Sequence, residues 1–401
     1  MTSPRPAPVP ALAPGNCAPL LLDVSRMVWR RWAGVRPTGI DRICLAWQLH
    51  YSAQSQATLV HQRVQTILSQ AASQSLFHLL AEDSPRGHFR RRFIGWALRH
   101  AGTLLRPLPG GGRLWLNVGH TGLNLPGLAD WVAAAGLRPV LMLHDIIPIT
   151  HPQHCREGEA ARHGERVAMM LRIAHAVIGN SQDTLDTLSA HAATTGQRLP
   201  ANRLAVWPGT PHLGRPAGGP APDTDDFIIL GTIEGRKNHL LLLDVWERLV
   251  AAQGQAAPRL VIIGRRGWAC DAVLARLAAG GFAGRVEETG PLSDDAIAAR
   301  LAGARALLFP SFAEGYGLPL VEALAAGVPV IASDLTVFRE IGQGVPDLLP
   351  PDDVDGWADA IMAYAAPASP ARAAQLARMA RFHAPDWPGH FAAVDAFLTG
   401  L

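Results

Sequence analysis

Residues 307–322 read LLFPSFAEGYGLPLVE, and this stretch indicates the fold more directly than any other part of the chain. Its first part is an apolar run that ends at Pro310, which predicts a buried β-strand. A glycine-containing loop follows, and Pro319 suits the first turn of a helix that begins near Leu318. A buried strand that leads through a short loop into a helix is the building unit of parallel α/β sheets, so we expect this class of fold.

Apolar runs and helical patterns alternate on both sides of this stretch, which predicts an α/β protein with two Rossmann-like, doubly wound domains. In the first half we expect strands at 20–24, 114–118, 140–144, 176–180 and 204–207, with helices at 40–51, 157–173 and 181–192. In the second half we expect strands at 227–230, 260–263, 306–309 and 328–332, with helices at 240–250, 271–279, 294–302 and 318–326.

The length of 401 residues also favours two domains over one. Residues 1–18 are rich in proline and alanine, and we expect them to be disordered. Residues 212–226, rich in glycine and proline, are typical of a linker, which leaves 19–211 and 227–383 as the two domains. We expect 384–401 to form a helix that returns to the first domain. Ligands of such sheets bind beyond the carboxyl ends of the strands, so the site should lie in the cleft between the domains.

The composition restricts the class of protein. A net charge of +3 gives no reason to expect a nucleic-acid partner. The four cysteines form no CxxC pair, which argues against a structural zinc site or a disulfide framework. Prolines interrupt any N-terminal signal, and no apolar run is long enough to span a membrane, so we expect a cytoplasmic protein. No first strand leads into GxGxxG and no GxxxxGK[ST] occurs, which disfavours a dehydrogenase or a P-loop kinase.

Two glutamates of the opening stretch are the first candidate site residues. Glu314 lies in the loop, within reach of sugar hydroxyls, and Glu322 lies about one turn into the helix, where its carboxylate can accept two hydrogen bonds from vicinal hydroxyls. The helix start, together with Gly315 and Gly317, forms an anion site suited to a diphosphate. Two such acids by themselves are more often a capping and a surface glutamate, but the glycines and the preceding strand favour a binding site.

This stretch resembles the E-x7-E element of glycosyltransferase family 4, and residues 326–334, AGVPVIASD, resemble the next strand of that family. The resemblance covers the whole second half of the chain. It implies a GT-B fold, an acceptor on the first domain, a nucleotide sugar on the second, and transfer that retains the anomeric configuration. It also implies that Glu314 contacts the donor sugar, that Glu322 contacts the ribose, and that four backbone amides lie along the diphosphate and the sugar: Gly315, Tyr316, Gly317 and Leu318.

Residues 231–239, GTIEGRKNH, resemble the phosphate-binding turn of the same family. Arg236 and Lys237 can neutralise a diphosphate and stabilise it as a leaving group, which is the role that the resemblance implies. A solvated basic turn is the alternative. Many family members have an arginine directly after the glycine, where this chain has Thr232. We therefore expect Thr232 to be a donor contact, while phosphate stabilisation depends more heavily on Arg236 and Lys237.

The first domain offers His144 and Gly39. His144 ends an expected strand and could position the donor sugar or orient the acceptor, whereas a histidine satisfied by Asp145 or by the backbone is the alternative. The family has a histidine near the donor sugar in this neighbourhood, which favours a catalytic role. Gly39 begins a helix and can approach a phosphate or the acceptor, while Arg42 in the same segment could be a surface residue. Ser181 resembles a helix-capping serine of the family and is expected to be structural.

Residues 86–99 mix arginines and aromatic residues at helical spacing. Such a helix can lie on an anionic membrane, with arginines on the headgroups and apolar side chains inserted, or it can pack on the first domain. Because family members often act on lipid-linked acceptors, we expect a peripheral position on the inner face of the cytoplasmic membrane. The expected membrane contacts are Arg90, Arg91, Arg92, Phe93 and Trp96.

The predicted function is transfer of a hexose from a nucleoside diphosphate sugar to a glycan or polyprenyl-linked glycan in bacterial exopolysaccharide or lipopolysaccharide synthesis. Residues 236–238 and 264–268 resemble those of mannosyl- and rhamnosyltransferases, which makes GDP-mannose the leading donor and dTDP-rhamnose or a UDP-hexose the alternatives. Arg236, Lys237 and the helix amides would replace a divalent metal, so we expect no metal and no other cofactor. A GT-B subunit without catalysis, or a GT-B epimerase or phosphorylase, are the other classes considered.

Overall fold

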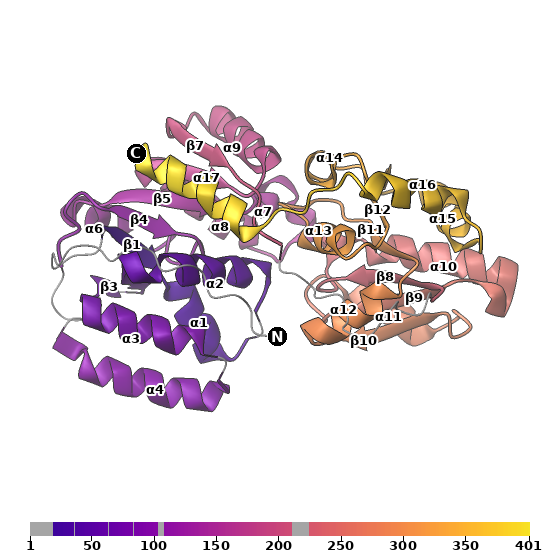
Figure 1. The fold of residues 1–401 in the computed structure, drawn as a ribbon, viewed down its shortest axis with the longest axis horizontal. Helices are drawn as coiled ribbons and strands as arrows, with labels where there is room; N and C mark the ends of the chain where they lie inside the picture. The colour runs from indigo at the N-terminus through magenta and orange to yellow at the C-terminus, as the bar shows by residue number, and fades with distance from the viewer. Residues whose placement is uncertain (1–18, 36, 63, 83, 103–107, 211–223) are drawn as a thin grey trace.

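The computed structural model describes residues 19–35, 37–62, 64–82, 84–102, 108–210 and 224–401, which form two α/β domains (Figure 1). Each domain has one sheet with buried apolar side chains on both faces. The expected fold class, with two Rossmann-like domains, is therefore confirmed. Residues 1–18, expected to be disordered, and 212–223 of the expected linker lie outside the described residues.

The N-terminal domain has a seven-stranded sheet in the order β3-β2-β1-β4-β5-β6-β7. Neighbouring strands are parallel except β2 and β3, which pair antiparallel at one edge. The strands are β1 (Leu20–Asp23), β2 (Ser55–His61), β3 (Val64–Ile67), β4 (Leu114–Asn117), β5 (Arg138–Leu143), β6 (Ala176–Gly179) and β7 (Asn202–Ala205). The helices are α1 (Ser25–Ala33), α2 (Gly39–Tyr51), α3 (Gln70–Ala81), α4 (Arg86–Arg99), α6 (Leu128–Ala134), α7 (Ile147–Thr150), α8 (Glu159–Ile173) and α9 (Gln182–Thr195).

The C-terminal domain has a six-stranded parallel sheet in the order β10-β9-β8-β11-β12-β13. Its strands are β8 (Asp226–Leu230), β9 (Arg259–Ile263), β10 (Val286–Gly290), β11 (Ala306–Phe309), β12 (Val330–Ser333) and β13 (Asp347–Leu349). Its helices are α10 (His239–Gln253), α11 (Asp271–Ala279), α12 (Asp294–Ala302), α13 (Leu318–Ala325), α14 (Thr336–Gly342), α15 (Val354–Ala365) and α16 (Pro370–Met379).

Every strand expected from an apolar run is present, and each end differs from expectation by two residues or fewer. Four observed strands were not expected: β2, β3, β10 and β13. Three of them lie at sheet edges, where one side is less covered, and their sequences contain polar residues. β2 begins with Ser55 and Gln56, which interrupt the apolar pattern although both are buried. Continuous apolar runs therefore identify central strands better than edge strands.

The end of the chain returns to the N-terminal domain as α17 (Trp387–Thr399), the yellow helix that crosses the purple part of Figure 1. Phe391 and Leu398 of α17 are buried in a core shared with α2. The Nε1 of Trp47 in α2 donates a hydrogen bond to Nε2 of His390 in α17 at 3.1 Å. Helix α17 therefore follows the C-terminal domain in sequence but packs on the N-terminal domain.

Helix α4 corrects the expected membrane contacts. Phe93 and Trp96 are only 9% and 6% exposed, because the apolar face of α4 packs on α1 and α3. Their expected insertion into a membrane is therefore wrong. Arg90 and Arg92 bond to groups of the protein itself, whereas Arg91 is exposed. Within the described ranges, no helix has the length and apolar character needed to cross a membrane.

Candidate active site

A cluster of charged side chains lies where β8 and β11 end, at the carboxyl edge of the second sheet. The turn after β8, Gly235–Lys237, brings Arg236 and Lys237 toward the loop after β11. The backbone N–H of Phe312 donates to the carbonyl of Arg236 at 2.8 Å, and the guanidinium of Arg236 donates to the carbonyl of Ala313 at 3.0 Å. Lys237 is only 6% exposed, so the alternative of a solvated basic turn is wrong.

Glu314 lies at the centre of this cluster. Its Oε1 is 2.6 Å from Nη1 of Arg236 and 2.5 Å from Nζ of Lys237, and it accepts a hydrogen bond from the hydroxyl of Ser311 at 2.8 Å. Burial alone would raise the pKa of Glu314, but the positive charges of Arg236 and Lys237 outweigh it and lower that pKa to about 2. Glu314 is therefore ionised at neutral pH and holds both cations in place.

Glu234 also belongs to the cluster, although its sequence context did not mark it as a site residue. Its carboxylate is 2.6 Å from Nε of Arg236, and its side chain is buried. Burial raises the pKa of Glu234, while the charge of Arg236 opposes that shift. An acid two residues before the Arg-Lys pair was visible in the sequence, but nothing marked it as buried. Two cations thus face two carboxylates before any ligand binds.

Two glycines of the loop after β11 lie where a side chain would not fit. Gly317 has a φ of +105°, and a Cβ there would lie 2.7 Å from the ring of Phe338. A Cβ on Gly315 would lie 2.1 Å from the carbonyl oxygen of His144 in the other domain. The side chain of Tyr316 is buried in the core of the C-terminal domain, so its backbone is the part that can meet a ligand.

The N-terminal domain contacts Glu322 of α13 directly. Nη1 of Arg42 in α2 is 3.1 Å from Oε1 of Glu322, and its Nη2 is 2.6 Å from Oδ1 of Asp294. Gly39 lies beside Leu318, where a Cβ would come within 2.7 Å of a methyl group. Burial raises the pKa of Glu322 to about 7, although the charge of Arg42 opposes that shift. Arg42 is therefore an interdomain contact rather than a surface residue, and it occupies the carboxylate predicted to bind ribose.

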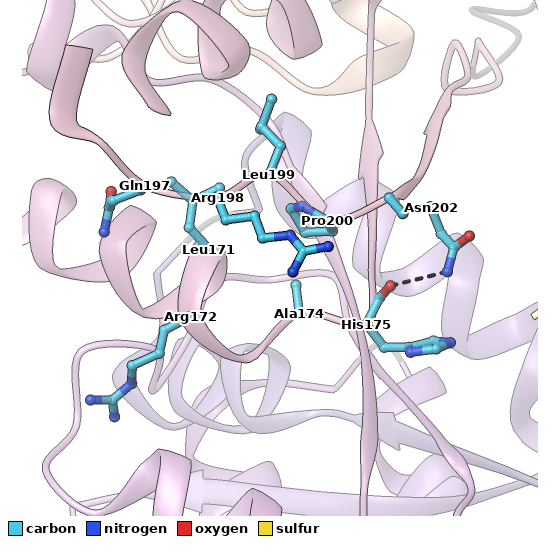
Figure 2. A pocket seen from close by; sticks show the side chains of 10 residues that line it. Leu171, Arg172, Ala174, His175, Gln197, Arg198, Leu199, Pro200 and Asn202 are labelled. Carbon is cyan, nitrogen blue, oxygen red and sulfur yellow. Dashed lines mark hydrogen bonds between the residues drawn. The ribbon is translucent and has the colours of Figure 1, made fainter. Parts of the chain in front are cut away.

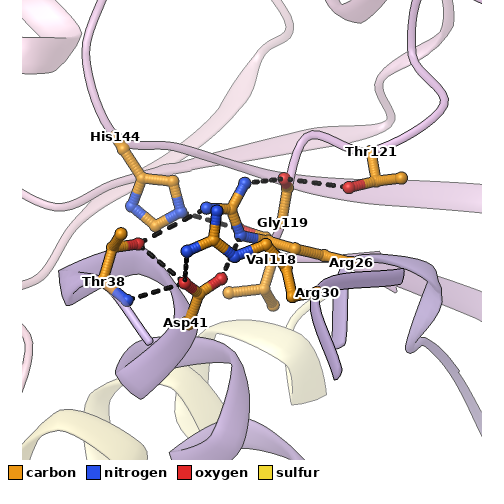
Figure 3. Close-up of polar contacts among 8 residues, drawn as sticks. All are labelled: Arg26, Arg30, Thr38, Asp41, Val118, Gly119, Thr121 and His144. Carbon is orange, nitrogen blue, oxygen red and sulfur yellow. Dashed lines mark hydrogen bonds and ion pairs between the residues drawn. The ribbon is translucent and has the colours of Figure 1, made fainter. Parts of the chain in front are cut away.

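His144 follows β5, and its carbonyl oxygen faces Gly315 of the other domain. Its ring lies beside Arg26 and Asp41 (Figure 3). Its Nε2 is 2.7 Å from the carbonyl oxygen of Val118, which makes Nε2–H the donor and leaves Nδ1 as an acceptor. Nδ1 has no hydrogen-bond partner among the described residues. Burial lowers the pKa of His144 to about 4, so the ring is neutral at pH 7. It can accept a hydrogen bond from a hydroxyl there, but it is a weak base.

Beside this histidine, two arginines of α1 hold the start of α2 (Figure 3). Nε of Arg26 and Nη2 of Arg30 lie 2.7 and 2.9 Å from the carboxylate of Asp41. Asp41 also accepts the backbone N–H of Thr38 at 2.7 Å, which completes a capping box. The network fixes the turn in which the candidate Gly39 lies.

Residues 224–366, which contain the charged cluster and Glu322, match the protein family described as "Glycosyl transferases group 1". The C-terminal domain is a glycosyl transferase group 1 domain. Two relatives from Escherichia coli match part of the chain. The "Serotype-specific mannosyltransferase WbdA" is 29% identical over 231 residues, 53% of this chain and 28% of WbdA. The "O-antigen chain mannosyltransferase B" is 34% identical over 135 residues, 34% of this chain and 35% of that protein. The matched part therefore spans about a third of these relatives' length, or less.

Solved structures share the fold over nearly the whole chain. The structure of Anabaena Alr3699/HepE in complex with UDP has a TM-score of 0.63 and 16% sequence identity, and the match covers 95% of this chain and 99% of that one. Sucrose-phosphate synthase (tll1590) from Thermosynechococcus elongatus has a TM-score of 0.56 and 16% identity, with 94% and 97% covered. At this identity the likeness shows the fold alone, which is the GT-B arrangement of two Rossmann-like domains.

Within the group 1 domain, Thr232 lies in the loop after β8, beside the loop after β9. A Cβ on Gly267 would lie 2.5 Å from the methyl group of Thr232, and Ile233 pairs with Arg266 in an isolated bridge. The structure thus groups Arg236 and Lys237 with Glu314, places Thr232 in the adjoining loop, and leaves Glu322 in contact with the N-terminal domain. Across the parts of the chain that are described, no group of three histidine, cysteine or acidic residues is arranged to hold a metal ion.

Two hollows differ in their relation to this site. One of about 240 Å³ lies at the junction of the group 1 domain and the N-terminal domain, and Asp145, Phe312 and Glu314 are among the residues that line it. Another of about 600 Å³ lies in the N-terminal domain, lined in part by Arg172 and Arg198 (Figure 2). It borders the amino ends of β6 and β7 and the C-terminal ends of α8 and α9. Ligands of parallel sheets bind at the opposite ends of the strands, so the second hollow is not part of the candidate site.

Proposed function

We propose that this protein transfers a hexose from a nucleoside diphosphate sugar to a hydroxyl of a glycan or lipid-linked glycan, with retention of the anomeric configuration. The observation that carries the proposal is the buried pairing of Arg236 and Lys237 with Glu314 at the carboxyl edge of the second sheet. Ligands bind at this edge in parallel sheets, and two cations held there suit a diphosphate. Retention is proposed from the family resemblance and not from the position of a carboxylate.

In this proposal Arg236 and Lys237 stabilise the departing nucleoside diphosphate. Negative charge grows on the leaving phosphate oxygen as the glycosidic bond breaks, and cations already removed from water act on it more strongly than solvated ones. Oε1 of Glu314 makes the contacts to both cations. We propose that the other carboxylate oxygen, Oε2, accepts hydroxyls of the donor sugar. Glu322 would accept the ribose hydroxyls once Arg42 releases it.

The same two cations are proposed to serve in place of a divalent metal. Phosphate charge that Arg236 and Lys237 neutralise requires no Mg²⁺ bridge. The test is turnover after treatment with EDTA, which should be unchanged. A loss of turnover that added Mg²⁺ or Mn²⁺ restores would show that this part of the proposal is wrong.

We propose GDP-mannose as the donor, because relatives that match part of the chain are named as mannosyltransferases. A structural neighbour was solved with UDP, so the experiment includes other nucleotides. Thermal shift with GDP-mannose, dTDP-rhamnose and UDP-glucose comes first, followed by measurement of nucleoside diphosphate release with and without acceptor. Stabilisation by GDP-mannose together with GDP release supports the proposal. If the protein instead binds and turns over dTDP-rhamnose or UDP-glucose, that compound is the donor and GDP-mannose is not. If none of the three stabilises the protein or is turned over, a non-catalytic GT-B subunit becomes the better description.

We further propose that the outward face of α4 meets an anionic membrane that carries the acceptor. Ile94 and Leu98, one turn apart on α4, are 49% and 75% exposed. Arg91 and Arg99 are exposed on the same helix, and no ion pair is seen for either in the described part of the chain. Exposed apolar side chains flanked by unpaired arginines suit a surface of anionic headgroups. In this proposal Ile94 and Leu98, and not the buried Phe93 and Trp96, meet the membrane.

A further inference from the structure

Three buried polar side chains lie at the start of α9, and two of them, Ser181 and Thr184, contact the loop that carries Glu314. We name Asn180, Ser181 and Thr184 the α9 cap. Oγ of Ser181 and Oγ1 of Thr184 lie 3.0 and 3.1 Å from the carbonyl oxygen of Gly315. A carbonyl oxygen has two lone pairs and can accept a hydrogen bond from each hydroxyl. The N-terminal domain thus holds a backbone group of the group 1 domain, one residue after Glu314.

The α9 cap also holds the end of β5. Nδ2 of Asn180 donates to the carbonyl oxygen of His144 at 2.9 Å, and its Oδ1 lies 3.0 Å from Oγ1 of Thr184. That carbonyl of His144 faces Gly315 so closely that no Cβ would fit between them. The cap therefore determines how far the loop of Glu314 lies from His144.

Glu340 of α14 holds the α9 cap from the side of the group 1 domain. Its carboxylate oxygens accept the backbone N–H groups of Gln182 and Asp183 at 2.9 and 3.0 Å, and the indole N–H of Trp207 at 2.7 Å. N–H groups in the first turn of a helix have no acceptor within the helix, and a carboxylate there is favoured by the helix dipole. The first turn of α9 is therefore fixed by contacts in both directions across the domain boundary.

Capping alone does not require these contacts with the loop. As the capping residue, Ser181 accepts the backbone N–H of Thr184 at 3.0 Å, which uses a lone pair and leaves its proton free to donate. A threonine inside a helix commonly donates back to its own helix, as Thr195 does to the carbonyl of His191 at 2.8 Å. The hydroxyl of Thr184 has one proton, and the two acceptors nearest to it lie outside α9: Oδ1 of Asn180 at 3.0 Å and the carbonyl oxygen of Gly315 at 3.1 Å. The two hydroxyls therefore do more than end a helix.

We infer that Ser181 and Thr184 are positioning residues of the transferase. By holding the carbonyl of Gly315 they orient the peptide that follows Glu314, and so determine where the donor sugar lies relative to His144. The inference rests on the proposed function. Arg236 and Lys237 bind the diphosphate through other contacts, so loosening the cap should lower turnover without weakening the binding of a nucleoside diphosphate.

The test compares Thr184→Val, which keeps the shape and removes the hydroxyl, with Thr184→Ser, which restores it. Thr195→Val is the matched control, because it makes the same change on the same helix where the hydroxyl bonds only locally. With GDP-mannose as donor, we expect kcat to fall about tenfold in Thr184→Val, as for the loss of one buried hydrogen bond. The Kd for GDP should be unchanged, and both Thr184→Ser and the control should match the wild type.

Hydrogen exchange of the backbone over residues 312–318, measured without any donor, provides a second readout. Thr184→Val should speed exchange in this segment, and Thr195→Val should not. Unchanged exchange, or faster exchange with unchanged kcat, would overturn the positioning role. An equal loss of kcat and of GDP affinity would also overturn it, because it would mean a general defect of the site. If the wild-type protein turns over none of the three nucleotide sugars, the proposed function itself is refuted. That result comes from the wild type alone and is therefore distinct from any effect of the variants.

Discussion

Glu314 and Glu322 are separated by seven residues, yet their environments have opposite effects on their protonation. Arg236 and Lys237 outweigh the burial of Glu314 and lower its pKa to about 2. Burial outweighs the single arginine beside Glu322 and raises its pKa to about 7, since that arginine also pairs with an aspartate. Near neutral pH Glu322 therefore exchanges a proton in the donor-free protein, whereas Glu314 stays charged.

The first prediction concerns Glu314 itself. Glu314→Gln keeps the shape of the side chain and removes the charge that balances Arg236 and Lys237. We expect turnover of the donor to fall roughly 100-fold, as for the loss of one important electrostatic contact in an active site. Glu314→Ala should in addition cost about 3–5 kcal/mol of unfolding free energy, because it removes the carboxylate that pairs with the buried ammonium of Lys237, whereas Arg236 keeps its pair with Glu234. Nucleoside diphosphate release and urea unfolding measure the two effects.

The control for this prediction is Glu247→Gln on α10, an exposed glutamate whose change should leave both quantities near those of the wild type. Full turnover by Glu314→Gln would show that Glu314 has only a structural role.

At the scale of elements, α17 is held to the first domain through a histidine that must be neutral. Nε2 of His390 accepts the indole N–H of Trp47 at 3.1 Å, while Nδ1, 2.9 Å from the carbonyl of Trp207, donates. Burial lowers the pKa of His390 to about 4, although the bond to Trp207 opposes that shift. Protonation of the ring would remove the acceptor that Trp47 uses, so the contact between α17 and α2 depends on pH.

The second prediction is a pH dependence of stability. The pKa of His390 is about 4 in the folded protein and about 6.5 in the unfolded chain, so unfolding takes up a proton between these values. The stabilisation from the neutral ring is complete above pH 6.5 and is lost as the pH falls toward 4. His390→Gln should therefore make the decline of unfolding free energy in this window shallower, by up to about 1.4 kcal/mol per pH unit.

Urea unfolding at pH 7, 6, 5 and 4.5 measures this slope. His88→Gln on the exposed face of α4 is the control and should keep the slope of the wild type. If the unfolding free energies of His390→Gln and His88→Gln fall equally steeply with decreasing pH, His390 does not contribute to the pH dependence.

The third prediction belongs to α4. Reversing two exposed charges with Arg91→Glu and Arg99→Glu should weaken binding to phosphatidylglycerol vesicles at least tenfold, because each basic residue near an anionic surface contributes about 1 kcal/mol. Co-sedimentation at low ionic strength is the measurement, with phosphatidylcholine vesicles as the uncharged reference. The pair Arg162→Glu and Arg198→Glu makes the same charge change elsewhere on the N-terminal domain. Equal losses in both pairs would indicate nonspecific attraction and not docking through α4.

For the molecule as a whole, two of the contacts between the domains bear directly on the candidate site. The α9 cap and Glu340 join α9 to α14, and Arg42 joins α2 to α12 and α13. The second contact involves the carboxylate proposed to bind ribose. Donor binding therefore has to exchange a contact between domains for a contact with the nucleotide.

The fourth prediction follows from this exchange. Arg42→Ala removes the competing contact, so we expect GDP to bind more tightly, by up to about fivefold for a partly exposed ion pair. Isothermal titration calorimetry at pH 7 measures the affinity. Arg276→Ala, which removes an exposed pair with Asp244 inside one domain, is the control. Weaker binding of GDP by Arg42→Ala would mean that Arg42 contacts the nucleotide directly.

The sequence by itself determined the fold class and most of the central strands, because a strand buried on both faces needs a continuous apolar run. It also predicted the turn after β8 and the loop after β11 as one site, since the carboxyl ends of neighbouring parallel strands meet at one edge. The closeness of Arg236, Lys237 and Glu314 agrees with that expectation, while their roles stay predictions.

The contacts that join distant parts of the chain follow from how the complete chain packs. Arg42 and Glu322 lie 280 positions apart, and no local pattern pairs them. The periodicity of α4 predicts one apolar face but not what covers that face. Phe93 and Trp96, which the sequence predicts to insert into a membrane, pack on α1 and α3. Ser181 was recognisable as a cap, yet its contact with Gly315 depends on how two domains meet. Local sequence encodes elements through short-range preferences, whereas contacts between domains depend on the packing of the complete chain.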